Sequence, residues 1–260
     1  KELSALREEV AGLAAAGYRE VVLTGINLSL YGRELGLRLP DAVEAAASVP
    51  GIDRVRIGSL EPELLTDADI ARLAAVPQLC GQFHLSLQSG CDATLARMNR
   101  HYTTARYREI AGALREKFPG CAITTDVITG FPGETPEEFA ETCGFVREMG
   151  FAMVHIFPYS ERRGTAAASM PDPVPMEERR RRASELAEIT AGSARAFYEA
   201  QVGSVQAVLI EKKREPDWVR GYTPNYTPVR VRCADDRRGE LLPVRITEAG
   251  PEGCTGVFGG

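Results

Sequence analysis

The sequence predicts an α/β protein with a second, all-β domain at its C-terminal end. Through about residue 200, short apolar runs alternate with amphipathic helical patterns, as in a parallel sheet covered by helices. This pattern fits an open doubly wound sheet and a barrel equally well. Beyond Gly203 it changes to short alternating strands broken by Gly, Pro and Asp, which is typical of a small antiparallel barrel. We therefore expect domains at 1–200 and 201–260.

The first domain is expected to contain five helix–strand units. Leu3, Leu6, Val10 and Leu13 share one helical face, Gly17 ends that helix, and EVVLTGI follows as a buried strand. A capping box at Thr135–Glu138 marks the start of a later helix. The other expected elements are helix 39–48, strand 54–59, a helix from 66, strand 83–88, helix 104–118, strand 122–129, a helix to 149 and strand 153–157.

A proline-rich stretch, MPDPVPM, then precedes a long helix over 177–200, which we interpret as the link between domains. The second domain is expected to contain five strands. Their sequences are VQAVLIE, WVRGYT, TPVRVRC, LLPVRIT and CTGVF.

Composition narrows the class of protein. The 260 residues carry a net charge of −5, no apolar run approaches the roughly 20 residues that span a bilayer, and the first residues are charged. We therefore expect a cytoplasmic protein with no membrane partner. The six cysteines are dispersed and predict buried free thiols. Residues 201–260 hold nine Lys or Arg against eight Asp or Glu, so a polyanion would meet only local basic patches.

Ligands of parallel α/β folds bind at the carboxyl ends of the strands. The segments after the five strands are polar and glycine-rich, but none contains the lysine that a Schiff base requires. Phosphate-loop, dinucleotide, hydrolase-elbow and zinc-protease motifs are also missing. We interpret His84, His101 and His155, which lie apart in the sequence, as packed or surface histidines.

Two strand ends carry polar residues that packing alone explains poorly. Ser86 and Gln88 project neutral hydrogen-bonding groups suited to a ribose or an amino-acid headgroup. In ITTDVITGF, Thr125, Asp126 and Thr129 form either a ligand site or a satisfied polar core network, and Gly130 with the following glycine lets the backbone approach a flat ligand.

Five motifs extend this interpretation over nearly the whole chain. VVLTGINLSLYG, SLEPE, LSLQSGCDATLARMNRHYT, TDVITGFPGETPEEF and HIFPYSERRGTAA resemble, in order and spacing, the radical S-adenosylmethionine methylthiotransferases. The TGINLSLYG and SLEPE versions are most similar to the branch that acts on threonylcarbamoyladenosine in tRNA. GYTPNYTPVRV is similar to the TRAM domain of that family. The resemblance implies a partial parallel (β/α) barrel of the radical-SAM type, with a small C-terminal β-barrel that docks tRNA.

The resemblance also implies roles for individual residues. Gly25 and Asn27 would meet the amino group of S-adenosylmethionine, Ser86 and Gln88 its ribose, and Arg100 its carboxylate. The segment from Asp126 to Gly130 would lie beside the adenine, with Phe157 stacked on it and with Tyr159 and Arg162 at the substrate. Glu61 and Asp126 are the candidate catalytic residues, although Glu61 could equally cap a helix. The tRNA backbone would be held by Lys212, Lys213, Arg214, Arg230, Arg232 and Arg162, cations that could also be a solvated surface.

One departure limits the resemblance. Family members bind a 4Fe-4S cluster through a C-x-x-x-C-x-x-C motif after the first barrel strand, and an N-terminal domain binds a second cluster; this sequence contains neither. We therefore expect a fragment that is inactive alone, from a monomeric enzyme that uses S-adenosylmethionine, 4Fe-4S clusters, tRNA and an electron donor. Alternatives are a methylthiotransferase for isopentenyladenosine tRNA or a ribosomal protein, a non-catalytic RNA-binding fragment, and an unrelated α/β enzyme for a nucleotide-like ligand.

Overall fold

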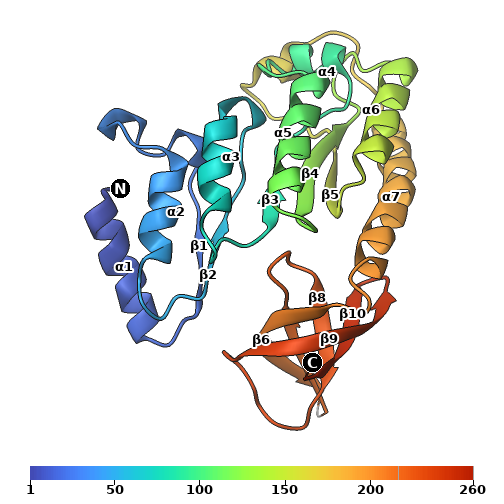
Figure 1. Cartoon of the computed structure of the whole chain (residues 1–260). Helices are drawn as coiled ribbons and strands as arrows, with labels where there is room; N and C mark the ends of the chain where they lie inside the picture. Colours follow the sequence, from blue (N-terminus) through green and yellow to red (C-terminus); the bar gives the residue numbers. More distant parts are fainter. Residues whose placement is uncertain (216, 260) are drawn as a thin grey trace.

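The computed structural model describes residues 1–215 and 217–259, with backbone only for 212–215. Five parallel strands lie side by side in chain order, each preceded by a helix (Figure 1). The elements of this part are α1 (Leu3–Ala15), β1 (Glu20–Leu23), α2 (Leu39–Ala47), β2 (Arg54–Ile57), α3 (Asp67–Ala74), β3 (Gln82–His84), α4 (Asp92–Arg97), α5 (Thr104–Lys117), β4 (Ala122–Thr129), α6 (Pro136–Met149) and β5 (Met153–Pro158).

The prediction of five helix–strand units is confirmed, and the strands form a partial barrel. Bridges from Val55 to Leu79 and from Leu60 to Leu85 join β2 to the strand that follows it, so the pairing continues around one curved sheet. The expected strand 83–88 is shorter, because only Gln82–His84 pairs regularly. Along β4, odd-numbered residues are buried towards the helices and even-numbered residues face the other, more open side. We call this second side the inner face.

The C-terminal strands close into a barrel in the order β10-β8-β7-β6-β9. Its core is a set of fully buried aliphatic side chains that includes Val208, Val219 and Val244. Five strands were predicted and are present, but β8 and β10 pair in parallel. The reason is geometric, because an odd number of strands cannot alternate direction all the way around a closed barrel. The strands are β6 (Val205–Glu215), β7 (Trp218–Tyr222), β8 (Pro228–Arg232), β9 (Leu241–Gly250) and β10 (Gly253–Phe258).

Helix α7 (Met176–Glu199) joins the two domains and, at 24 residues, is about 36 Å long. Its first turns are fixed to the loop that follows β4 by a buried ion pair between Arg182 and Glu134, with 3.2 Å from Nη1 to Oε1. Burial raises the pKa of Glu134, and the charge of Arg182 opposes that rise. Within the described residues, no helix has the length and apolar character needed to cross a membrane.

The C-terminal barrel lies beneath the amino ends of the parallel strands (Figure 1), and three charged side chains connect the two. Glu20 of β1 pairs with Arg56 of β2, with 2.9 Å from Nε to Oε1, and with Arg54 at 3.5 Å. All three side chains are at least 89% buried. We call Glu20, Arg54 and Arg56 the floor cluster. Burial lowers the pKa of Arg54, and Glu20 is among the groups that oppose this.

The two arginines of the floor cluster bind backbone carbonyl groups of the second domain. Arg54 and Arg56 each donate hydrogen bonds to two carbonyl groups of the barrel, three of them at 2.8–3.1 Å. The Arg56 guanidinium also lies 4.6 Å from the centre of the Tyr226 ring. Three of these four carbonyl groups belong to the GYTPNYTPVRV motif, which therefore forms most of this contact. The accepting carbonyls belong to Ala207, Tyr222, Thr223 and Pro224.

Neutralising Glu20 should destabilise the protein strongly. In Glu20→Gln, two buried guanidinium groups lose their only carboxylate in this cluster, a change that typically costs about 3–5 kcal/mol. The measurement is the free energy of unfolding in urea. Glu199→Gln, which breaks the exposed Arg195–Glu199 pair, is the matched control and should change it by less than about 1 kcal/mol. Equal effects of the two changes would contradict this account.

Candidate functional site

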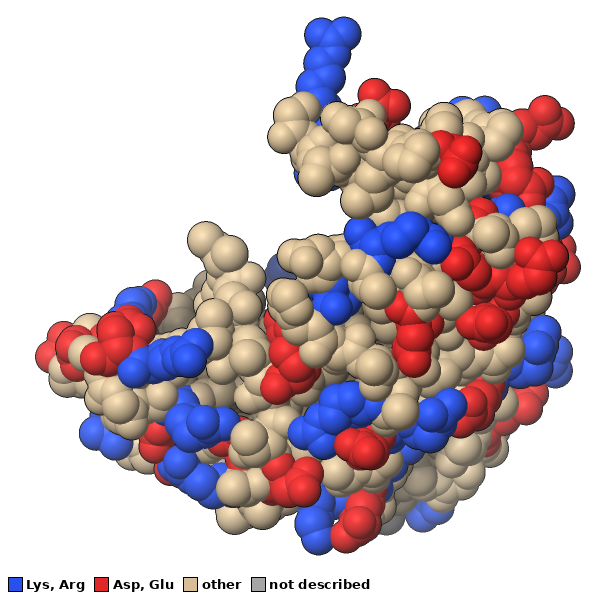
Figure 2. All heavy atoms as spheres, turned by 90° about the horizontal axis from the view of Figure 1, so that it is seen from above, with Lys and Arg blue, Asp and Glu red and all other residues tan. Residues whose placement is uncertain are grey.

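The carboxyl ends of all five parallel strands meet at the edge of the sheet opposite the C-terminal barrel (Figure 1). Figure 2 looks onto this edge, where acidic and basic side chains are interspersed and the surface is hollowed between two arms. We call this edge the rim. It brings together most of the polar segments on which the sequence analysis relied, because parallel strands that lie side by side end on the same side.

A cavity of about 460 Å³ opens at the rim above β4 and β5. Gln88, Asp126 and Phe157 line it together, as the sequence analysis expected of residues that share one ligand. Phe157 is half exposed on the inner face. Tyr159 also lines the cavity, and its hydroxyl is buried without a hydrogen-bond partner among the described residues. Arg162 also lines this cavity.

Glu61 and Arg100 form a pair at the neighbouring strand ends, with 3.6 Å between Oε2 and Nη1. The bridge between Leu60 and Leu85 brings these two strand ends together. Burial raises the pKa of Glu61, while Arg100 opposes the rise. Glu61 Oε2 is buried without a hydrogen bond among the described residues. A carboxyl group held in this way is more typical of a functional site than of a helix cap.

Ser86 is buried, and its amide donates to the carbonyl of Leu60, the residue before Glu61, at 3.0 Å. The Tyr102 hydroxyl donates to the carbonyl oxygens of Ser86 and Leu87, at 2.9 and 3.0 Å, and so fixes the strand end that leads to Gln88. Gln88 itself has φ = +69°, a strained value for a residue other than glycine. Such strain is common where a side chain is aimed into a site.

Gly25 and Asn27 do not line the cavity that holds Gln88. They lie at the end of β1, both exposed, and border a separate cavity of about 610 Å³ along β1 and α1. The expected cofactor residues therefore lie in three places. Gly25 and Asn27 border one cavity, Gln88, Asp126 and Phe157 line another, and Arg100 pairs with Glu61.

Gly130 has a structural explanation. Its φ is +70°, and a Cβ atom would lie 2.4 Å from Cγ of Arg179 in α7. Its amide donates to Glu134 Oε2 at 2.6 Å. Glycine is thus required here because the backbone passes close to α7. Thr125 and Thr129 donate to backbone carbonyls, so for them the interpretation as a satisfied core network is confirmed.

The structure brings together His84, Asp126 and His155, which the sequence analysis did not connect. His84 Nε2 lies 3.3 Å from Asp126 Oδ2, and one potential ligand atom of each residue lies within 4.8 Å of the others. For these two histidines the interpretation as packed or surface residues missed a cluster. The signal was present in the alternation of the strands, because residues 84, 126 and 155 all fall on the inner face.

The cysteines do not form a site for an iron–sulfur cluster. All six are free, and the prediction of buried thiols is confirmed for Cys80, Cys91, Cys143 and Cys254. Burial raises the pKa of Cys80, Cys143 and Cys254 to about 11, which disfavours the thiolate that a cluster needs. Among the described residues, no group of cysteines could hold a metal ion.

The expected RNA-binding cations fall in three places. The side chains of Lys212, Lys213 and Arg214 lie outside the described residues. Arg230 and Arg232 are exposed on β8. Arg162 belongs to the rim.

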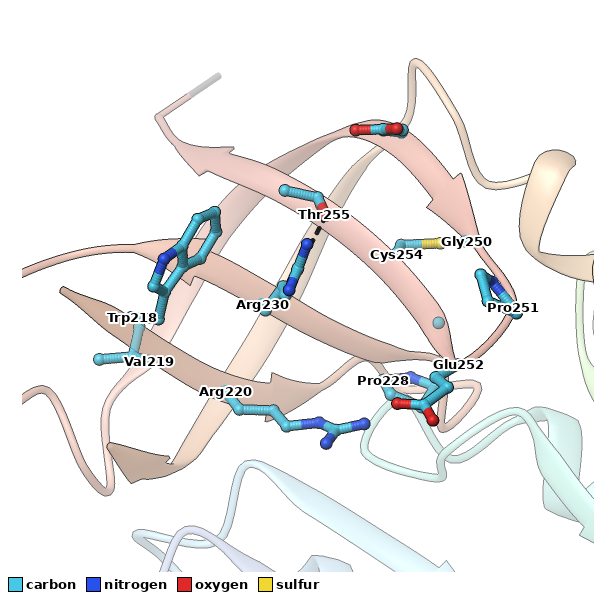
Figure 3. Close-up of a pocket in the computed structure, with 12 residues that line it drawn as sticks. Trp218, Val219, Arg220, Pro228, Arg230, Gly250, Pro251, Glu252, Cys254 and Thr255 are labelled. Carbon is cyan, nitrogen blue, oxygen red and sulfur yellow. Dashed lines mark hydrogen bonds between the residues drawn. The ribbon is translucent and has the colours of Figure 1, made fainter. Parts of the chain in front are cut away.

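On the C-terminal barrel, the Arg230 guanidinium lies 4.9 Å from the centre of the Trp218 ring. Both residues line a cavity of about 470 Å³ that Arg220 also borders (Figure 3). Sequence reasoning missed Trp218, the only tryptophan, as a partner of these arginines.

Comparison with known proteins adds two family matches and several relatives. The Radical SAM superfamily matches residues 1–146 and the TRAM domain matches 199–256. A tRNA-2-methylthio-N(6)-dimethylallyladenosine synthase of Symbiobacterium thermophilum is 40% identical over 93% of this chain and 54% of its own length. The threonylcarbamoyladenosine tRNA methylthiotransferase MtaB of Thermotoga maritima is 35% identical over 97% and 58%. The chain spans about half the length of the curated relatives it matches.

Solved structures agree on the fold. Coproporphyrinogen III oxidase of Escherichia coli, a radical SAM enzyme, has a TM-score of 0.56 at 16% identity and covers 85% of this chain and 59% of its own. The methyltransferase TsrM of Kitasatospora setae has a TM-score of 0.51 at 17% identity over 61% and 31%. With a family match over more than half of its length, the chain belongs to the radical SAM superfamily, and a TRAM domain follows its partial barrel.

Proposed function

We propose that this chain is the barrel and RNA-binding part of a tRNA methylthiotransferase, which adds a methylthio group to carbon two of an N6-modified adenosine. The observation that carries the proposal is the joining of a radical SAM barrel, with a ligand-sized cavity at its rim, to a TRAM barrel that the floor cluster fixes in place. The names of the relatives support the same reaction. A tRNA and an electron donor are the proposed partners of a monomeric enzyme.

S-adenosylmethionine, when bound, supplies the radical and the methyl group for this reaction. We propose that Gln88 and Asp126 hold its polar groups at the rim, that Phe157 stacks on its adenine, and that Arg100 meets its carboxylate. For Gly25 and Asn27, which border the separate cavity along β1 and α1, a contact with its amino group stays a prediction. The work of these residues is to hold the ligand and a base in register and to exclude water.

The chain alone should not cleave S-adenosylmethionine reductively. Its described cysteines are dispersed and mostly buried, so they do not fit a 4Fe-4S cluster. Release of 5′-deoxyadenosine from the chain after treatment with iron, sulfide and dithionite would contradict this.

The finer choice of substrate rests on charge at the rim. Threonylcarbamoyladenosine carries a carboxylate, whereas the dimethylallyl group is apolar. Arg162 lines the cavity with its side chain exposed, so the rim offers a cation to a carboxylate. We therefore propose threonylcarbamoyladenosine as the substrate. Dimethylallyladenosine is the second candidate, because the relatives of higher identity carry that name.

Analysis of tRNA nucleosides separates these candidates. In cells that lack the gene, we expect loss of the 2-methylthio form of threonylcarbamoyladenosine, with its unmethylthiolated form retained. Loss of the methylthiolated dimethylallyl nucleoside would select the second candidate. An unchanged nucleoside profile would overturn the proposed function.

Glu61→Gln removes the carboxyl group proposed to act on the substrate, and we expect the fold to remain stable. Because burial raises the pKa of Glu61, the folded state binds this proton more tightly than the unfolded chain. The contribution of protonated Glu61 to the stability of the fold is therefore complete below its unfolded pKa of about 4.3. This contribution is lost as the pH rises through the pKa that Glu61 has in the folded state.

The free energy of unfolding of Glu61→Gln should accordingly exceed that of the parent at pH 7 and match it near pH 4. Urea titrations at both pH values measure this difference. The exposed Glu8→Gln is the control and should show neither effect. A Glu61→Gln variant that is less stable than the parent at pH 7 would mean that the pair with Arg100 outweighs burial.

Neutralising Arg230 and Arg232 together should weaken tRNA binding. If both contact phosphates, the slope of log K against log salt should become shallower by about 1.4–1.8. Binding is measured on this chain by fluorescence anisotropy with labelled tRNA at several salt concentrations. Arg106→Ala with Arg108→Ala on α5 removes the same charge from another exposed surface and should leave the slope unchanged. An equal loss in both double variants would show a purely non-specific effect of net charge.

A further inference from the structure

The inner face of the sheet carries two imidazoles and a carboxylate on three neighbouring strands. Asp126 of β4 is directly opposite His155 of β5 in the parallel register, and His84 of β3 is opposite Thr124, two residues before Asp126. Residues 124 and 126 face the same side because side chains alternate along a strand. The fold therefore places all three groups on the same part of the inner face.

The orientation of His84 favours a ligand on its Nε2 atom. Its Nδ1 atom is hydrogen-bonded to Thr124 Oγ1 at 3.1 Å, and its Nε2 atom faces Asp126 Oδ2 at 3.3 Å. Histidines that bind metals usually have one ring nitrogen fixed in this way by a second group. The His84 and His155 rings are 5.9 Å apart, and no described side chain is hydrogen-bonded to His155.

The spacing is close to that of a metal site. Two ligands at about 2.0–2.1 Å from a tetrahedral ion lie about 3.3–3.4 Å apart, which matches the distance between His84 and Asp126. The most distant pair of ligand atoms lies within 4.8 Å. His155 is exposed on an edge strand, so its ring is free to approach the other two ligands.

We propose that His84, Asp126 and His155 bind one divalent transition-metal ion. Two imidazoles and one carboxylate suit Zn²⁺, Fe²⁺ or Co²⁺ and leave a coordination position open. Asp126 also lines the rim cavity, so the ion would lie beside the space in which a ligand would bind. The site uses nitrogen and oxygen donors, so it is distinct from any thiolate-bound cluster, and it goes beyond the proposed function.

The test is titration of the chain with Co²⁺, followed by visible absorption and by equilibrium dialysis. We expect one ion per chain, displaced by Zn²⁺, with the absorption of nitrogen and oxygen ligands. His84→Gln and His155→Gln should each weaken binding by more than about 100-fold, and Thr124→Val by about 10–100-fold. His101→Gln removes the third histidine of the chain, which is exposed, and should bind like the parent.

Three results would overturn the proposal: no stoichiometric binding by the parent, unchanged affinity in both His84→Gln and His155→Gln, or sulfur-to-cobalt charge-transfer absorption, which would assign the ion to cysteines. His155 is exposed, so its variant keeps the test valid if the His84 variant fails to fold. The titration contains neither S-adenosylmethionine nor tRNA. Its failure would therefore leave the proposed methylthiotransferase function unaffected.

Discussion

The buried carboxylate of Glu20 is the constraint on which the arrangement of the two domains depends. Two guanidinium groups and one carboxylate out of water are stable only if every donor finds an acceptor, and Arg54 and Arg56 find theirs in carbonyls of the C-terminal barrel. Because backbone carbonyls have fixed directions, these bonds set the orientation of the barrel beneath the sheet. Asn225, which donates to the Gly120 carbonyl at 3.0 Å, adds a second attachment.

The sheet separates two kinds of surface. Its outer face packs aliphatic side chains against the helices. Its inner face carries polar groups along the strands, from Thr124 through Asp126 towards the rim. Side chains two residues apart on one strand face the same side and are separated by about 6.6 Å along the strand, so they form successive layers on the inner face. Asp126 of the His84–Asp126–His155 group lines the rim cavity, and so does Phe157, which follows His155 by two residues on β5.

The rim and the C-terminal barrel lie at opposite ends of the molecule, connected by α7 over about 36 Å (Figure 1). A substrate that touches both must be long. The proposed tRNA satisfies this requirement, with a splayed base at the rim and its backbone on the exposed face of β8, where Arg230 lies beside Trp218. The floor cluster then acts as the rigid joint between the two contact regions.

By itself the sequence determined the order of helices and strands, the five-stranded second domain and the polar character of the strand ends. These features are local: they follow from hydrophobic periodicity, capping residues and glycines, which neighbouring residues decide. Only the tertiary structure decided that the sheet curls into a partial barrel, that Arg54 and Arg56 are buried, and that Glu61 pairs with Arg100. It alone joined His84, Asp126 and His155. Such contacts connect residues 30 to 170 positions apart, and their energies depend on burial and direction, which no local pattern encodes.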